Sequence, residues 1–213
     1  MEDLNPKPLR VYVTGVPGTG KTSFAEKIAE KLRGLHVELG KLCADEKLIL
    51  GFDEERGCMI ADLEKMRRHL YRRFKRAEEP LIFEAPFTLK LRSHLAPSKI
   101  FVLRCEPKVL AERLKGKGYP PRKIMENVWA EILDYCLHDA LAAYSPEKIH
   151  EIDTSFKSVE EAVDEALKVL SEEIKPSWGK TFWLKKLEEK GILEEILLAK
   201  DEAEALEKLA KAN

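Results

Sequence analysis

The sequence predicts an α/β domain organised around a phosphate-binding loop. Residues 15–22 (GVPGTGKT) match the complete pattern G-x-x-x-x-G-K-[ST]. A short apolar run over 9–14 predicts a buried strand directly before this loop, and an amphipathic pattern over 23–33 predicts a helix directly after it. At 213 residues the chain is long enough for one such domain with a sizeable core and some additional segments.

The residue types of this loop suit the binding of a nucleoside triphosphate. Its glycines permit backbone angles that other residues avoid and let amide groups approach phosphate oxygens closely. We expect Lys21 to reach the β- and γ-phosphates and Thr22 to offer its hydroxyl to Mg²⁺, because both lie on the first turn of the following helix. A glycine turn that only caps a helix is the alternative. The predicted ATP-binding residues are Gly15, Gly18, Thr19, Gly20, Lys21, Thr22 and Ser23, together with Lys117.

The composition argues against a globally charged protein and against a membrane protein. The chain carries 37 Lys and Arg against 38 Asp and Glu, a net charge of -1, so any nucleic-acid surface must be local. No apolar run approaches the roughly 18 residues of a membrane span, and we expect a cytoplasmic protein. The cysteines form no C-x-x-C pair, which favours reduced core thiols over a disulfide or a zinc site. They are Cys43, Cys58, Cys105 and Cys136.

Between the first helix and residue 80, the pattern predicts one strand and two helices. Residues 35–39 predict a strand and 42–50 a helix, whereas 51–58 has the composition of an exposed loop. Over 60–77, apolar positions recur at helical spacing. The other side of that helix is basic and could be an RNA or ribosomal contact surface, or simply a solvated helix face. The basic residues are Arg67, Arg68, Arg72, Arg73, Lys75 and Arg76.

Two further apolar strands end in charged residues. Residues 81–84 end in Glu84, and an acid at the end of a strand beside a phosphate-binding loop supports Mg²⁺, usually through water. We therefore predict that Glu84 helps to hold the metal, with capping of the next turn as the alternative. Residues 100–104 end in Arg104, which is expected at the sheet edge where ligands bind.

A short lid is predicted after the strand at 100–104. Pro107 begins a short helix, and residues 115–122 combine two glycines, two prolines and three cations. Such cations can neutralise the charge that develops during phosphoryl transfer, and glycines can absorb a closing motion. A plain turn between two helices is the alternative. We predict catalytic roles for Lys21, Arg113 and Lys117.

The remaining chain is predicted to complete the sheet and to add a helical tail. The patterns indicate a long helix over 122–144, an edge strand over 148–152, and a helix that begins with a capping box at Ser158 and runs to about residue 174. Beyond Pro176, residues 180–213 predict two or three short amphipathic helices. None of the five histidines has a partner at metal-ligand spacing, so all five are predicted to be structural or surface residues.

Four stretches of the sequence, in this order, resemble a known family. They are residues 15–23; residues 51–55 with Cys58; residues 101–104; and residues 112–114 leading into 118–119 and 126–127. On these stretches the chain is similar, from about residue 9 to 174, to the atypical adenylate kinase family of the isoenzyme 6 type. That family is also described as a small-subunit ribosome-maturation NTPase.

The resemblance implies a fold, a reaction and partners. The fold is a P-loop NTPase-type three-layer sandwich with a five-stranded parallel sheet, an acceptor region near 38–61 and a lid near 116–126. The domain spans 1–175 and leaves 176–213 as a helical C-terminal extension. The reaction is transfer of the ATP γ-phosphate to AMP or another nucleoside monophosphate, with Mg²⁺ as cofactor and ATPase activity alongside. A small-subunit ribosomal protein and rRNA are the implied macromolecular partners.

Three positions depart from the family pattern. The segment 84–86 is Glu-Ala-Pro where the family has Asp-x-His, so the carboxylate is kept and the histidine is not. Ala44 stands in place of an arginine of the acceptor helix, and Lys117 in place of a lid arginine, which keeps the charge but not the bidentate geometry. Two alternatives therefore stay open: an ATP-driven ribosome-assembly factor with little kinase activity, and a P-loop kinase for another small metabolite.

Overall fold

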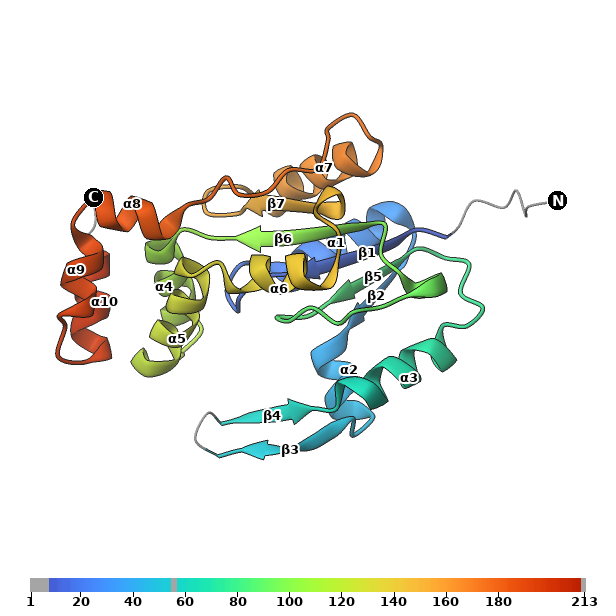
Figure 1. Ribbon diagram of the computed structural model, residues 1–213, viewed down its shortest axis with the longest axis horizontal. Coiled ribbons are helices and arrows are strands. Elements are labelled where there is room, and N and C mark those ends of the chain that lie inside the picture. Colours follow the sequence, from blue (N-terminus) through green and yellow to red (C-terminus); the bar gives the residue numbers. More distant parts are fainter. Residues whose placement is uncertain (1–7, 55–56, 212–213) are drawn as a thin grey trace.

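The computed structural model describes residues 8–54 and 57–211. Five strands form a parallel sheet in the order β2-β5-β1-β6-β7, with β1 in the centre and β7 at one edge (Figure 1). The sheet confirms the predicted α/β class and the predicted edge strand. The strands are β1 (Arg10–Thr14), β2 (Leu35–Glu38), β5 (Leu81–Glu84), β6 (Lys99–Arg104) and β7 (Ile149–Asp153).

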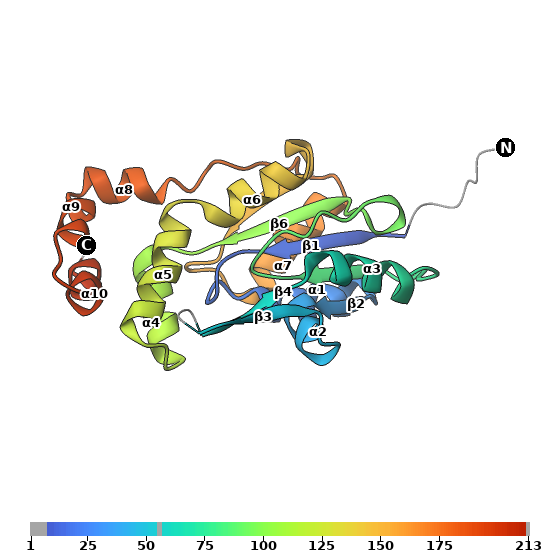
Figure 2. The ribbon, with the colours of Figure 1, turned by 60° about the horizontal axis from the view of Figure 1, so that its bottom comes forward.

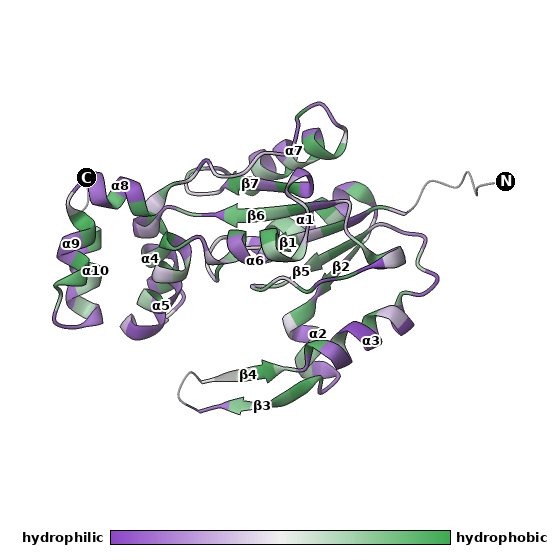
Figure 3. Cartoon of the chain, viewed as in Figure 1, coloured by the Kyte–Doolittle hydropathy of each residue, from purple (hydrophilic) through white to green (hydrophobic). Residues whose placement is uncertain are grey.

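Helices cover both faces of the sheet, because successive side chains along a strand point to opposite sides. Val11 and Val13 pack on one face in a cluster with residues of α1 and α7. Tyr12 packs on the opposite face in a second cluster with residues of α2, α3 and α6. The result is the predicted three-layer sandwich, with apolar residues concentrated in the strands (Figure 3). The covering helices are α1 (Lys21–Leu32), α2 (Leu39–Asp45), α3 (Leu63–Arg73), α6 (Tyr135–Ala143) and α7 (Val159–Leu170).

The segment predicted as a helix over 42–50 contains both a helix and the start of a strand. Helix α2 begins three residues earlier and ends at Asp45. Lys47 then adopts a left-handed conformation with a φ of 53°, which turns the chain out of the helix. The predicted helix is therefore wrong in its second half.

The predicted exposed loop over 51–58 is also wrong, because an antiparallel hairpin occupies this segment. Strand β3 (Ile49–Asp53) pairs with β4 (Cys58–Ala61), while residues 55–56 lie outside the described part. Half-buried and exposed residues alternate along β3, as expected of a strand with one covered face. The polar composition of residues 51–58 predicts a loop, whereas the alternation of covered and exposed residues along β3 indicates a strand. The hairpin forms a separate two-stranded sheet that extends from α2 and α3 at the bottom of Figure 1.

Two of the predicted long helices are shorter in the structure. Residues 60–61 belong to β4, and Asp62 caps α3 by accepting a 2.9 Å hydrogen bond from the Lys65 amide, so that α3 ends at Arg73 rather than 77. The predicted helix over 122–144 is split into α5 (Pro121–Ile132) and α6. The break falls at Asp134, which has a φ of 54° and forms an ion pair with Arg104. Similarly, α7 ends at Leu170, four residues before the predicted end.

A buried arginine closes the end of the sheet that lies away from the phosphate loop. Arg10, 2% exposed, donates to the carbonyl oxygens of Ala77 at 2.6 Å, Glu79 at 2.8 Å and His94 at 3.2 Å. These carbonyls belong to the two loops that lead into β5 and β6. One guanidinium thus satisfies backbone groups that would otherwise be buried without partners.

Three short helices follow the last helix of the sandwich, in agreement with the predicted helical extension. They lie beside α4 and α5 in both ribbon views (Figures 1 and 2). Cys43, Cys105 and Cys136 are buried free thiols, as predicted, whereas the Cys58 side chain lies outside the described part. The remaining elements are α4 (Pro107–Gly116), α8 (Trp183–Glu189), α9 (Ile192–Leu197), α10 (Glu202–Ala210) and the 3₁₀ turns Ser93–Leu95 and Pro146–Lys148.

Candidate phosphate and nucleotide site

The phosphate loop connects the central strand β1 to α1 and is held by close backbone contacts. Gly15 has a φ of 144°, and a Cβ atom there would lie 2.5 Å from the carbonyl oxygen of Leu103 in β6. Gly18 has a φ of 93°, and its Cβ would lie 2.8 Å from Leu110 of α4. Only glycine fits both positions, so the loop lies tightly against β6 and α4.

Thr19 supports the loop from within. Its hydroxyl donates to the Val16 carbonyl at 2.9 Å, and its side chain is fully buried. The hydroxyl of Thr154 donates to the Thr19 carbonyl at 2.9 Å and to that of Arg104 at the same distance. Sequence reasoning missed Thr154, because it meets the loop only through the adjacency of β6 and β7. Its position directly after β7, at the ligand edge of the sheet, was the available signal.

Lys21 lies over the loop at the start of α1. It is 7% exposed, and its Nζ donates to the Val16 carbonyl at 3.1 Å. Burial lowers the pKa of its ammonium group, and the nearby Glu84 carboxylate opposes this shift. Two of its three donor hydrogens are left for phosphate oxygens. Lys21 thus lies against the loop, and its predicted contact with the phosphates stays a prediction.

Glu84, Thr22 and His36 meet beside the loop. β5 is hydrogen-bonded between β1 and β2, which places the end of the Glu84 strand next to both. The Thr22 hydroxyl donates to Glu84 Oε2 at 3.4 Å, and His36 Nε2 lies 3.3 Å from the same oxygen. The predicted pair is thus together, but the contact of His36 was not predicted, because it depends on the pairing of β2 with β5.

This carboxylate and hydroxyl fit a magnesium ion. Mg²⁺ prefers oxygen ligands and is commonly held through one or two protein oxygens, with phosphates and water completing its shell. In the described ranges, no group of three His, Cys, Asp or Glu side chains could hold a metal alone. Thr22 and Glu84 would therefore hold the metal together with the phosphates of a bound nucleotide.

The predicted cations Arg113 and Lys117 line a cavity of about 300 Å³ beside the loop, together with Lys157. The Arg113 guanidinium donates to the carbonyl oxygens of Thr154 at 2.7 Å and Ser155 at 3.1 Å. Arg113 therefore supports the wall of the cavity, whereas Lys117, at the C-terminal end of α4, has its exposed ammonium group nearby. Ser23 and Gly20 also line this cavity.

The prediction that Arg104 lies among the ligand-binding groups is wrong. Its side chain is 2% exposed, and its Nε donates to Glu131 at 2.8 Å. Its two remaining nitrogens contact Glu151 and Asp134. Burial lowers the pKa of Arg104, but the surrounding carboxylates raise it by more. The reason for the error is that α5 and the residues before α6 bring Glu131 and Asp134 to the end of β6, where they pair with the buried Arg104 side chain.

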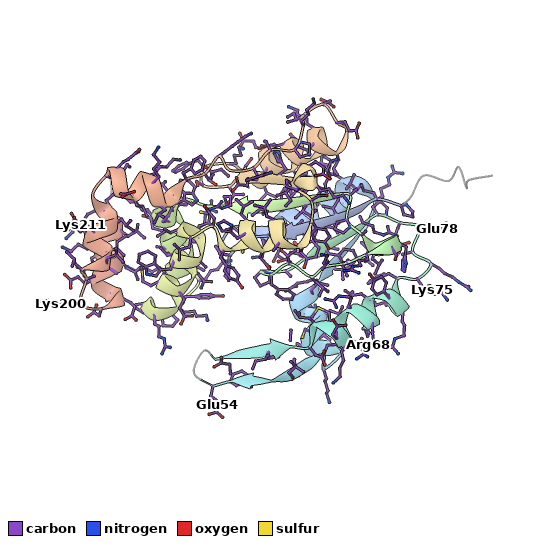
Figure 4. All side chains as sticks on the ribbon, viewed as in Figure 1. Glu54, Arg68, Lys75, Glu78, Lys200 and Lys211 are labelled. Carbon is purple, nitrogen blue, oxygen red and sulfur yellow. The ribbon has the colours of Figure 1, made fainter. Side chains whose placement is uncertain are left out.

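The segment predicted to bind the acceptor, together with α3 beside it, carries exposed cations and exposed apolar side chains. A pocket of about 640 Å³ on α3 is lined by Lys65, Arg68, Arg72, Tyr71 and Leu48. Across the hairpin, Phe52 pairs with Met59, and both are exposed. The side chains of Arg68 and Lys75 point away from the sheet (Figure 4). This half of the molecule therefore offers surface on which a ligand could pack.

The fold is shared with small-molecule kinases of known structure. Shikimate kinase from Bacteroides thetaiotaomicron superposes with a TM-score of 0.52 at 17% identity, over 76% of this chain and 98% of that one. A gluconokinase from Sinorhizobium meliloti superposes with a TM-score of 0.50 at 22% identity, over 79% and 94%. Together with the phosphate loop, this fold defines a P-loop protein.

The sequence relatives specify the family within that class. A model of the AAA domain family matches residues 11–134. A "Putative adenylate kinase" from Methanocaldococcus jannaschii is 33% identical over 179 residues, 84% of this chain and 94% of that protein. An adenylate kinase isoenzyme 6 homolog from Caenorhabditis elegans is 33% identical over 148 residues, 68% and 79% respectively. The chain belongs to this adenylate kinase family and is a phosphotransferase.

In the described residues, none of the helices has the length and apolar character that a membrane crossing requires.

Proposed function

We propose that this protein transfers the γ-phosphate of ATP to AMP. The proposal is supported mainly by the phosphate loop with its buried Lys21. The Thr22–Glu84 pair lies on one side of this loop, and a cavity that Lys117 lines lies beside it. The names of the relatives support AMP as acceptor. Phosphoryl transfer needs in-line positioning and charge neutralisation rather than a protein nucleophile.

The chain's own residues divide this work. The loop amides and the N-terminal end of α1 bind the β-phosphate, and Lys21 neutralises charge on the oxygens between the β- and γ-phosphates. Lys117 neutralises charge from the opposite wall of the cavity, while Arg113 holds that wall in place. Mg²⁺, when bound, neutralises phosphate charge and orients the triphosphate, held through Thr22 and Glu84.

The acceptor is assigned to the region formed by 38–61, whose exposed apolar side chains can cover a nucleobase. Arg68 of α3 points away from the sheet that carries the phosphate loop, so it is not assigned to the acceptor phosphate. ADP formation from ATP and each common monophosphate tests this assignment in a coupled assay. AMP should give the largest kcat/KM, and absence of ADP with every monophosphate would reject the kinase.

A second candidate function rests on basic residues of α3 and of the turn that follows it. Arg68 and Arg72 of α3, and Lys75 and Arg76 after it, are exposed, and none has an acidic partner within 4.0 Å among the described residues. A cluster of unpaired cations in a protein of net charge -1 suits the phosphate backbone of RNA. Under this proposal, ATPase activity drives a role in small-subunit maturation, with rRNA and a ribosomal protein as partners.

A double charge reversal tests whether these cations bind RNA or only form a solvated surface. Arg68→Glu with Arg72→Glu should weaken binding to a small-subunit rRNA fragment and reduce the slope of log affinity against log salt by about 2. Lys200→Glu with Lys211→Glu, at the opposite end of the molecule (Figure 4), is the matched control. Equal loss in both variants would show non-specific attraction, and no binding by the parent would reject the role.

A further inference from the structure

One buried arginine faces three carboxylates at the carboxyl ends of β6 and β7. Arg104 contacts Glu131, Glu151 and Asp134. The Glu131 and Glu151 side chains are 2% and 1% exposed, whereas that of Asp134 is 26% exposed. A single guanidinium cannot balance these charges, so the two buried carboxylates need further hydrogen-bond donors.

Those donors come from residues 179–183 of the extension. Glu151 accepts hydrogen bonds from the amides of Gly179 and Lys180, the latter at 3.1 Å, and from the hydroxyl of Thr181 at 3.0 Å. Trp183 Nε1 donates to Glu131 Oε1 at 2.9 Å. Withdrawal of the segment would leave buried carboxylates without these partners, so the extension is fixed to the sandwich at this point.

Glu131 also connects the extension to the lid. It lies at the C-terminal end of α5, the helix that follows the turn 117–120. At the other end of the extension, Leu206 and Leu209 of α10 line a cavity of about 490 Å³ together with Ile124 of α5. In both ribbon views, α9 and α10 lie on the side of α4 and α5 away from the sheet (Figures 1 and 2). The α4–α5 arm is therefore held between the phosphate loop and the extension.

The same arm forms one wall of the nucleotide site. Leu110 and Leu114 of α4 pack at Gly18, Arg113 supports residues 154–155, and Lys117 ends α4. A displacement of α4 by the extension would change the space around the loop and the position of Lys117. The contacts thus link the tail of the chain to the ATP site.

We propose that the C-terminal extension sets the position of the α4–α5 arm for ATP binding. Trp183 is the positioning residue, because its hydrogen bond to Glu131 joins the extension to α5. The relative from Methanocaldococcus jannaschii is aligned over 94% of its length but over 84% of this chain, so this chain is the longer one. This proposal rests on the proposed kinase function only where KM values are measured, because ATP affinity and hydrogen exchange can be measured without catalysis.

The substitution Trp183→Phe tests this role in the full-length protein, because it keeps an aromatic side chain, although a smaller one, and removes the N–H donor. ATP affinity measured by calorimetry should fall about five-fold or more, and KM for ATP should rise by the same factor with KM for the monophosphate unchanged. Trp178→Phe is the matched control, because Trp178 is 43% exposed and precedes the bonded segment. Unchanged ATP affinity in folded Trp183→Phe protein would overturn the proposal.

Thermodynamic reciprocity gives a second measurement on the unaltered protein. If docking of the extension favours ATP binding, ATP must favour docking. A non-hydrolysable ATP analogue should therefore slow hydrogen exchange at the Gly179 and Lys180 amides, whereas AMP should not. Thr181→Val, which removes one donor with little change in shape, should lessen the slowing and replaces Trp183→Phe if that variant does not fold.

The outcomes separate this inference from the proposed function. Exchange that is equal with and without the analogue would overturn the inference whatever the enzyme catalyses. Slowed exchange and the affinity loss, in a protein that forms no ADP from any monophosphate, would support the inference while rejecting the kinase.

Discussion

The part of the molecule proposed to bind ATP, the donor half, and the part proposed to bind the monophosphate, the acceptor half, differ in how far their side chains are already paired. Around the phosphate loop, Lys21, Thr19 and Arg113 all donate to backbone carbonyls of the protein. In the acceptor half, Leu50 is 70% exposed and Phe52 60% exposed, and α3 carries unpaired cations. The donor half is therefore formed before its ligand binds, whereas the acceptor half leaves surface that a ligand would have to cover.

The change expected to have the largest effect is Lys21→Ala. It removes the buried ammonium group from the phosphate site, so phosphoryl transfer should fall about 10²–10³-fold, as for other preorganised charge-stabilising groups. The coupled ADP assay measures this loss. Lys31→Ala, an exposed lysine in the last turn of the same helix, serves as control. Activity equal to that of the parent would remove the basis for the donor site.

Glu84→Gln tests the metal role within the donor half. It keeps the size of the side chain and removes its charge, so the Mg²⁺ concentration for half-maximal ATP affinity should rise about 10–100-fold. A Mg²⁺ titration at fixed ATP reports this shift. The Mg²⁺ dependence should be unaltered in Glu79→Gln, whose site lies before β5 at the other end of that strand. An equal dependence in the two variants would contradict the assignment.

Gly18→Ala measures how tightly the donor half is packed. The variant strains a φ of 93° and places a methyl group 2.8 Å from Leu110, so a stability loss of about 2–4 kcal/mol is expected. Gly20→Ala is the control: its φ is 90°, but its Cβ meets nothing within 4 Å, so only the strain of about 1 kcal/mol applies. Denaturant unfolding of both proteins without nucleotide gives the difference. Equal losses would show that α4 does not pack on the loop.

Leu50→Ser tests the acceptor half. Because Leu50 is exposed, stability should change by less than about 0.5 kcal/mol, while KM for the monophosphate should rise about three- to ten-fold. Leu198→Ser is the control variant, since Leu198 is 75% exposed and lies in the extension, so KM for the monophosphate should not change. Steady-state kinetics give the KM values of both variants, and thermal melts give their stabilities. A rise in KM for ATP alone would place Leu50 at the wrong half of the site.

The smallest expected effect lies on the far face of the sandwich, which serves as a reference for both halves. Hydrogen bonding to His150, helped by Lys157, lowers the pKa of Glu165 from 4.5 to about 2. The ionised form is thus favoured in the folded state, and its stabilisation is present above pH 4.5 and is lost as the pH falls toward 2. Glu165→Gln should cost about 1 kcal/mol at pH 7 and less at pH 3, whereas exposed Asp164→Asn should cost little at either pH.

The sequence predicted the donor half better than the acceptor half for a physical reason. The phosphate loop is local, so eight consecutive residues specify both its shape and its chemistry. Glu84 could be predicted from the order of loop, helices and strand. The contacts of His36 and Thr154 depend on which strands become neighbours, and no local pattern encodes that choice.

The errors in the prediction have the same origin. The polar residues around Asp53 favour a loop, yet a strand of a hairpin with only one covered face also carries polar residues on its exposed side. The break between α5 and α6 is associated with the ion pair of Asp134 with Arg104, which are 30 residues apart. The division of the chain at 175/176 stays a prediction, and the hydrogen bonds from residues 179–181 to Glu151 and from Trp183 to Glu131 show how closely the two parts are joined.

The buried Arg10 at the opposite end of the sheet has a consequence for how this enzyme can diversify. Its guanidinium joins the loops before β5 and β6 to the start of β1, so the spacing of the three central strands is maintained without help from any substrate. Substitutions in the hairpin, where we propose that the acceptor binds, can then change that surface while the frame that carries the phosphate loop stays the same.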